Sequence, residues 1–159
     1  SKAFLGIVTV LAALMMAFNM SIPGIPVIFY GDEIGMPGGN DPDNRKMMKF
    51  KELTPEELNL KEKTARLAKF RRNNMAMIYG EFTPVMAEKD VFIFSRSYFN
   101  SLCIIAMNKG SNERKLNIEI PERFKENKIK AFDSDTDITI KNHKLEIKLQ
   151  ANSFVIYHN

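Results

Sequence analysis

The side chains best suited to chemistry lie close together near residue 40. Asp41 and Arg45 are four residues apart, and Pro42 stiffens the turn between them. A carboxylate and a planar guanidinium that converge on one sugar can form strong, directional hydrogen bonds to its vicinal hydroxyls. We therefore predict that Asp41 and Arg45 bind substrate. The alternative is an ion pair that only pins the loop, because surface pairs of this kind are common.

Two further carboxylates, Asp32 and Glu33, precede this pair. Retaining cleavage of a glycosidic bond needs two carboxyl groups about 5 Å apart, one as nucleophile and one as acid. Neighbouring residues in an extended segment point to opposite faces, so Asp32 and Glu33 are poorly placed to serve one anomeric carbon. We expect both carboxylates to accept hydrogen bonds from backbone or Arg groups rather than to be that catalytic pair.

The same segment gives no signal for a metal or a cofactor. Residues 41–46 begin like a calcium-binding loop, but Arg45 and Lys46 stand where a ligand and a glycine are required. Gly38 and Gly39 are not followed by the Gly-Lys-Ser/Thr of a phosphate-binding loop, and we expect them to let the loop fold over. The two histidines lie far from the loop in sequence. We therefore predict no metal site and no cofactor.

The sequence predicts that a helix, a strand and a second helix position this loop. This order of elements is typical of an α/β fold. Residues 3–20 are predicted to be an apolar helix that ends at the breaker group 21–24. Residues 26–30 show no polar alternation, and we predict a short strand buried on both faces. Residues 54–57, Thr-Pro-Glu-Glu, carry the signature of a helix start, and the helix is predicted to continue to residue 72.

After residue 80 the hydrophobic period changes from helical to alternating, and we place a domain boundary there. Turn groups at hairpin spacing separate eight expected strands, at residues 82–86, 91–97, 102–108, 115–120, 128–132, 138–140, 144–149 and 153–158. Such a series predicts an antiparallel sheet or a small sandwich. The predicted fold class is therefore α/β followed by all-β.

Composition and charge exclude several classes of protein. The 159 residues are 45% hydrophobic and 26% charged, which predicts a packed core rather than disorder. The net charge of +4 comes from basic residues interleaved with acidic ones, which argues against nucleic-acid binding. The single cysteine, Cys103, excludes an internal disulfide and is expected to be buried and inert. None of this distinguishes a periplasmic, secreted or cytoplasmic location.

Two stretches carry a family resemblance: residues 24–36, Gly-Ile-Pro-Val-Ile-Phe-Tyr-Gly-Asp-Glu-Ile-Gly-Met, and residues 38–45, Gly-Gly-Asn-Asp-Pro-Asp-Asn-Arg. They resemble the last barrel strand and following loop of the α-amylase family (glycoside hydrolase family 13), especially neopullulanases, cyclomaltodextrinases and cyclodextrin glycosyltransferases. The resemblance implies that residues 1–80 are the last helix, strand and helix of a (β/α)8 barrel. It implies that residues 81–159 are the antiparallel β-sandwich C-terminal domain. Because a whole barrel needs about 250 residues, the chain is expected to be a C-terminal fragment.

The resemblance also implies an activity. Members of the family hydrolyse or transfer α-1,4 or α-1,6 glucosidic bonds, as in starch, by a retaining double displacement. Asp41 and Arg45 match family residues that bind glucosyl units on the non-reducing side of the cleavage point. The family's catalytic carboxylates lie upstream, so the resemblance implies that this chain holds no catalytic residue and is inactive alone. Residues 46–50 depart from the Pro-Met-x-Trp of many relatives and lack the aromatic residue that would stack on sugar there.

Besides its α-glucan oligosaccharide substrate, the chain is expected to need a protein partner. A lone strand at residues 26–30 would leave backbone groups unpaired at both edges. We therefore expect the N-terminal third to pack on the rest of the barrel or on a homo-oligomer partner.

Two rival functions remain open. One is a non-catalytic carbohydrate-binding or scaffold module, which would expose aromatic side chains along one sheet face, with candidates Phe92, Phe94, Tyr98 and Phe99. The other is a membrane-tethered domain that uses residues 3–18. That run is shorter than the span of about 20 residues that a membrane requires, so we favour a buried helix and expect no membrane partner.

Overall fold

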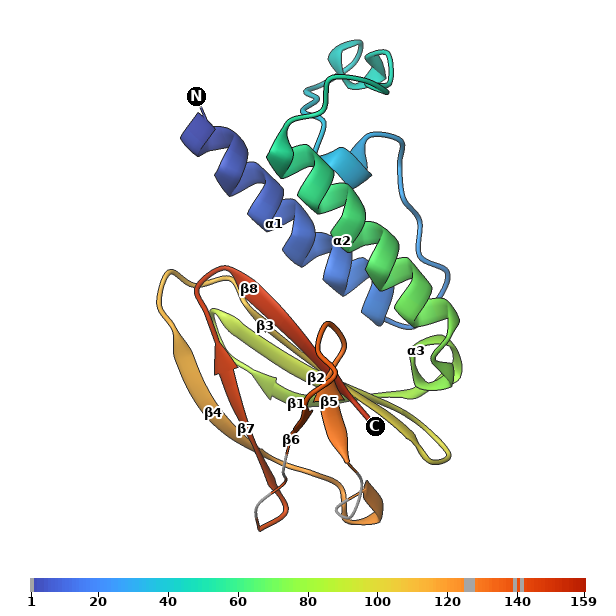
Figure 1. Ribbon diagram of the computed structural model, residues 1–159, viewed down its shortest axis with the longest axis vertical. Coiled ribbons are helices and arrows are strands. Elements are labelled where there is room, and N and C mark those ends of the chain that lie inside the picture. Colours follow the sequence, from blue (N-terminus) through green and yellow to red (C-terminus); the bar gives the residue numbers. More distant parts are fainter. Residues whose placement is uncertain (1, 125–127, 139, 141) are drawn as a thin grey trace.

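The computed structural model describes residues 2–124, 128–138, 140 and 142–159. Two long helices form one layer, which lies across one face of an antiparallel sheet, and a smaller sheet covers the other face (Figure 1). The mixture of helices and antiparallel strands confirms the coarse fold class predicted from the sequence.

The helical layer consists of α1 (Lys2–Ser21) and α2 (Pro55–Arg72), which run side by side in the same direction (Figure 1). The predicted start of α2 is confirmed: the Thr54 hydroxyl accepts from Glu57 N at 3.3 Å, and the Glu57 carboxylate accepts from Thr54 N at 2.7 Å. This capping box satisfies two backbone donors that a helix start leaves free. A short helix that the sequence analysis missed, α3 (Met75–Tyr79), follows α2.

The strand predicted at residues 26–30 is not formed, and this prediction is wrong for the described chain. Residues 25–29 have no regular secondary structure, and every described strand lies C-terminal to residue 80. The segment is exposed rather than buried, with 74% of Val27 and 56% of Phe29 accessible. A strand forms only where a neighbour pairs its backbone. The described residues supply no such neighbour here, so the apolar segment stays extended and unpaired.

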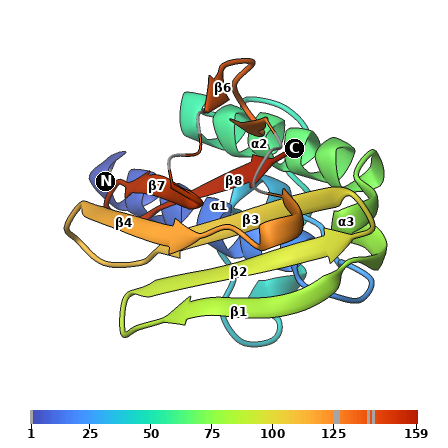
Figure 2. The same cartoon turned by 90° about the horizontal axis from the view of Figure 1, so that it is seen from below.

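The eight strands expected after residue 80 are all present, each within a few residues of its predicted bounds, apart from residues 139 and 141, which lie outside the described ones. The larger sheet is antiparallel throughout, in the order β1 (Glu81–Ala87), β2 (Val91–Tyr98), β3 (Ser101–Asn108), β8 (Ser153–His158), β5 (Ile129–Ala131) and β6 (Asp137–Ile138). The smaller sheet pairs β4 (Arg114–Glu119) with β7 (Lys144–Leu149). Figure 2 shows β4 and β7 on the side of the larger sheet away from the helices.

Alternation along the central strands divides the core between the two faces of the larger sheet. Ile93 and Ile104 face the smaller sheet and pack with Leu145 and Ile147 of β7. Their neighbours along the strands point the other way, into a second cluster beneath α1 and α2, which includes Phe94, Cys103, Ile105, Ala17 and Leu67. The larger sheet is therefore buried on both faces, and it provides the rigid base on which the helices and their connecting loop rest.

Candidate functional site

The loop between the two long helices opens with a tight turn, η1 (Asp32–Ile34), flanked by Gly31 at φ 95° and Gly35 at φ 64°. These left-handed conformations favour glycine. The Asp32 carboxylate accepts from Phe29 N at 3.1 Å, and the Glu33 carboxylate accepts from Gly31 N at 2.8 Å. The expectation that both carboxylates accept backbone hydrogen bonds is confirmed, and each carboxylate stabilises this turn.

Ile34 anchors the turn to the helices and is fully buried. The next residue, Gly35, lies so close to α2 that an added Cβ would sit 3.2 Å from a methyl carbon of Leu60. The start of the loop is therefore fixed against the helical layer, and the loop is free to project beyond it, as Figure 1 shows at the N-terminal end of α2.

The structure brings the two predicted substrate-binding residues together. Arg45 Nε lies 2.8 Å from Asp41 Oδ1, and the side chains are 74% and 57% exposed. Arg45 closes a short 3-10 turn, η2 (Asp43–Arg45). The pair thus presents a carboxylate beside a guanidinium, both open to solvent, with donor and acceptor edges that can still reach a ligand. An ion pair that only stabilises the loop would make the same contact, so the geometry does not distinguish this alternative from substrate binding.

A second set of contacts fixes the loop without using this pair. The Asp43 carboxylate accepts from Gly39 N at 2.9 Å and lies 2.9 Å from Lys46 Nζ. The hydrogen bond from Lys46, and then that from Gly39, hold the pKa of Asp43 below its ordinary value. At the base of the loop, the Tyr30 hydroxyl donates to Lys46 O at 3.1 Å. These contacts close the loop without using the side chains of Asp41 and Arg45.

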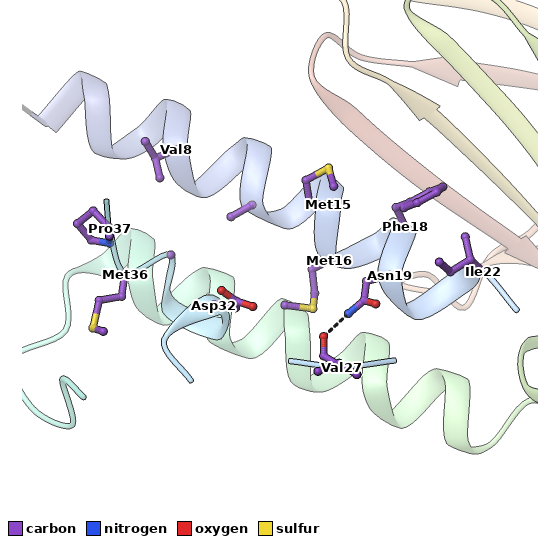
Figure 3. Close-up of a pocket in the computed structure, with 13 residues that line it drawn as sticks. Val8, Met15, Met16, Phe18, Asn19, Ile22, Val27, Asp32, Met36 and Pro37 are labelled. Carbon is purple, nitrogen blue, oxygen red and sulfur yellow. Dashed lines mark hydrogen bonds between the residues drawn. The ribbon is translucent and has the colours of Figure 1, made fainter. Parts of the chain in front are cut away.

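A cavity of about 630 Å³ lies beneath the turn, between α1 and the extended segment (Figure 3). Met15, Met16, Val27 and Met36 give it apolar walls, and Asn19 crosses it by donating to Val27 O at 2.7 Å. Asp41 and Arg45 do not line this cavity, so the exposed pair and the cavity are separate features.

Two buried arginines, which the sequence analysis did not single out, hold the turn that leads into the loop. Arg71 of α2 donates at 2.8, 3.2 and 2.6 Å to the carbonyl oxygens of Met20, Ile22 and Gly24. These carbonyls lie at and just beyond the end of α1, where a helix leaves acceptors unsatisfied and carries a partial negative charge. Burial lowers the pKa of Arg71, yet a guanidinium stays cationic at any ordinary pH.

The second arginine, Arg96 of β2, is 1% exposed and joins the sheet to the same turn. It donates to Ser21 O at 2.6 Å and twice to Gly80 O, at 3.0 and 2.9 Å. An added Cβ on Gly80 would lie 2.2 Å from Ala76 O, so only glycine can stand where this carbonyl is presented. Arg96 thus connects the β strands to the end of α1 and, through it, to the loop between α1 and α2.

The remaining residues named in the sequence analysis have mostly structural roles. Cys103 is fully buried, as predicted, and burial raises the pKa of its thiol to about 12. His158 packs its ring edge against Phe70 at a centroid distance of 4.9 Å. Among the four aromatic candidates for a binding face, Phe94 is buried and Phe92 is half-buried, while the last two, Tyr98 and Phe99, are exposed.

Two searches of the described residues bear on other classes of function. No described helix is long and apolar enough to cross a membrane. No group of three or more described His, Cys, Asp or Glu side chains converges as a metal-ligand set.

Comparison with known proteins finds similarity to the C-terminal part of α-amylase-family proteins. Residues 80–157 match the model of the Alpha-amylase C-terminal domain family. A cyclomaltodextrin glucanotransferase of Bacillus sp. (strain 38-2) is 35% identical over 97 residues, which are 61% of this chain and 13% of that protein. A cyclomaltodextrinase of Thermoanaerobacter pseudethanolicus is 35% identical over 100 residues, 63% of this chain and 17% of that protein. The chain spans less than a fifth of the length of either relative.

The similarity extends to the helical part. The crystal structure of an α-amylase from Geobacillus thermoleovorans, complexed with acarbose, matches with a TM-score of 0.82 and 25% identity. The match covers 94% of this chain and 33% of that one, so it extends over the helical part as well as the sheets.

Proposed function

We propose that this chain supplies a substrate-binding loop and a C-terminal β domain to a retaining glycoside hydrolase acting on α-glucans. The chain belongs to the α-amylase family by its likeness to the C-terminal part of those enzymes. The observation that carries the proposal is the exposed Asp41–Arg45 pair, 2.8 Å apart, on a loop that its own contacts already close.

The proposed architecture assigns residues 1–80 to the last part of a (β/α)8 barrel and residues 81–159 to a β-sandwich. The parallel course of α1 and α2 supports the barrel assignment, because the chain must run back between them as a barrel strand does. The exposed, unpaired segment at residues 25–29 is the expected state of such a strand without its neighbours. The apolar cluster shared by the two sheets supports the sandwich.

The proposed role of the pair is to hold one glucosyl unit. The Asp41 carboxylate accepts hydrogen bonds from sugar hydroxyls, and the Arg45 guanidinium donates to neighbouring sugar oxygens. Both side chains are more than half exposed, so a ligand reaches them without opening the fold. The α-amylase of Geobacillus thermoleovorans is complexed with acarbose in its crystal structure, which supports a carbohydrate ligand for this chain.

The proposed mechanism places the reacting carboxylates outside this chain. Asp32 and Glu33 each accept a backbone N–H group of their own turn, and we assign them to holding that turn rather than to the roles of nucleophile or proton donor. We therefore predict that the purified 159-residue chain does not release reducing sugar from maltoheptaose. Turnover that survives repurification and is unchanged in the variants Asp32→Asn and Glu33→Gln would contradict only the prediction that the chain is inactive. Turnover that is lost in those variants would contradict the structural role assigned to Asp32 and Glu33.

The binding role is tested by removing each member of the pair. Asp41→Ala and Arg45→Ala are each expected to raise the Kd for maltoheptaose, measured by calorimetry, at least tenfold, because each loses charge-assisted hydrogen bonds worth about 1.5–3 kcal/mol. Their melting temperatures should equal that of the wild type. The matched control is Glu88→Ala, which breaks another exposed ion pair, with Arg114 at 2.7 Å, and should leave the Kd unchanged. Lower melting with an unchanged Kd would instead identify a pinning role.

A further inference from the structure

The turn that follows α1 leads the chain into the extended segment and then into the loop. Arg71, a buried residue of α2, holds this turn through three of its carbonyl oxygens. Its Nη1 donates to Met20 O and Ile22 O, and its Nη2 donates to Gly24 O. Gly24 has a φ of 106°, a left-handed conformation that favours glycine. One guanidinium thus sets the direction in which the chain leaves the end of α1.

Two buried cations meet at this turn, which is a costly arrangement even at the negative end of a helix. Besides Arg71, the buried guanidinium of Arg96 donates to Ser21 O at 2.6 Å. The two charges oppose each other: burial, and after it the charge of Arg71, lowers the pKa of Arg96. Buried charges are retained in some proteins because they select a single geometry. The arrangement therefore points to selection of one geometry for the turn.

A short series of contacts joins the turn to the Asp41–Arg45 pair. Beyond the turn, Asn19 of α1 donates to Val27 O at 2.7 Å, so the extended segment is held against the helix (Figure 3). The segment leads to Tyr30, whose hydroxyl donates to Lys46 O at 3.1 Å, and Lys46 follows Arg45 in the chain. The place of the pair relative to the helical layer therefore depends on where the segment starts, as well as on the η1 turn at its other end.

We propose that Arg71 is a positioning residue for the Asp41–Arg45 pair: by fixing the turn after α1, it sets where the extended segment and the loop stand. This rests on the proposed function for its choice of ligand. The pair precedes the first turn of α2, and Arg71 lies in the last turn, about 24 Å further along the helix axis. Arg71 therefore acts on a sugar held by the pair only through the loop.

The test changes the turn in three ways. Arg71→Met should raise the Kd for maltoheptaose about fivefold, measured by calorimetry well below the melting temperature. It should also shift the amide NMR signals of Tyr30 and Arg45 without any ligand. Arg71→Lys should fall between wild type and Arg71→Met, because an ammonium group lacks the fixed fork that reaches all three carbonyls. Gly24→Ala, whose added Cβ meets no described atom within 4 Å, disturbs the turn only through its φ and should also raise the Kd and shift these signals.

Asn108→Ala is the matched control for lost stability. The buried Asn108 side chain also makes three hydrogen bonds to backbone groups, donating to Asn112 O and Gln150 O and accepting from Gly110 N. These bonds lie within the β domain. Asn108→Ala should therefore melt at a lower temperature, as Arg71→Met should, but its Kd and its loop NMR signals should equal those of wild type. If Arg71→Met does not fold, the Lys variant and Gly24→Ala decide the outcome against this control.

Three results would overturn the positioning role. These are loop signals that stay unshifted in the folded Arg71 and Gly24 variants, shifted signals with an unchanged Kd, or an equal rise of the Kd in Asn108→Ala, which would assign the effect to lost stability. In an Asp41→Ala background, Arg71→Met should raise the Kd no further, and a further rise would also overturn the role. A wild-type chain that binds no maltoheptaose would overturn the proposed function instead. The ligand-free NMR signals would then decide whether Arg71 fixes the loop.

Discussion

At the scale of single residues, the role of each loop carboxylate is decided by its partners. Asp32, Glu33 and Asp43 accept backbone N–H groups and so hold the loop together. Asp41 instead meets the exposed side chain of Arg45. Four acidic residues in one short segment look equivalent in sequence. Asp43 also pairs with an exposed cation, Lys46, but it accepts from Gly39 N as well, whereas the described contact of the Asp41 carboxylate is with Arg45. This difference is the physical basis for choosing it as a ligand-binding group.

A buried carboxylate at the start of α2 predicts a pH effect. Burial raises the pKa of Glu57, but hydrogen bonds from Lys49 and from Thr54 N outweigh it, and the pKa lies below the ordinary 4.5. A carboxyl group with a lowered pKa stabilises the fold above its unfolded pKa, and this stability is lost as the pH falls through the folded pKa. Glu57→Gln should therefore destabilise by about 1 kcal/mol at pH 7.

Urea titrations of wild type and Glu57→Gln at a series of pH values measure this effect. The difference between the two unfolding free energies should shrink as the pH falls below about 4.5 and through the lowered pKa of Glu57. Glu62→Gln is the control, because Glu62 is an exposed residue of the same helix. A difference that does not change with pH would mean that the charge of Glu57 does not stabilise the helix start.

At the scale of elements, hydrogen bonds from the buried arginines hold the helices and the sheet together. Arg96→Met should lower the unfolding free energy by about 3 kcal/mol, since the carbonyls of Ser21 and Gly80 lose three hydrogen bonds inside the protein. Arg96→Lys should fall between wild type and Arg96→Met. Urea denaturation measures both, with Arg114→Met as an exposed control within about 0.5 kcal/mol of wild type. Equal stability of all four proteins would show that the junction does not depend on Arg96.

The elements differ in how far the sequence predicts them. Strands such as β7, in which buried Leu145 and Ile147 alternate with exposed Glu146, are evident because pattern and pairing agree. The capping box of α2 is equally evident, since its signals are local. Residues 26–30 have the composition of a buried strand. The sequence analysis predicted that such a strand would need neighbours from elsewhere, but not that it would fail to form without them. Arg96 reads as an ordinary polar residue of β2, because its partners lie far away along the chain.

At the scale of the whole molecule, one face of the helical layer carries apolar side chains without cover. Ile7, Leu11 and Met15 recur every four residues along α1 and are 61%, 43% and 63% exposed. The unpaired segment at residues 25–29 adds further apolar surface, including Ile25 at 92% exposure. A surface of this kind associates with itself when its proper partner is absent. The account therefore predicts that the isolated chain is not a stable monomer at high concentration.

Light scattering coupled to size-exclusion chromatography checks this prediction. The apparent mass should rise above 18.2 kDa as the concentration increases, and Met15→Glu should shift it back toward the monomer. Leu58→Glu, which changes a partly exposed residue of α2, serves as the control and should leave the association unchanged. A wild-type chain that stays monomeric at millimolar concentration would contradict the need for a partner.

The measurement that tests the central claim most directly is a double-mutant cycle of Asp41→Ala and Arg45→Ala, read both by the Kd for maltoheptaose and by the unfolding free energy. If the two side chains hold one glucosyl unit, the double variant should bind about as weakly as either single variant, with no coupling in stability. Coupling in the unfolding free energy together with an unchanged Kd would contradict the account, because the pair would then only stabilise its loop.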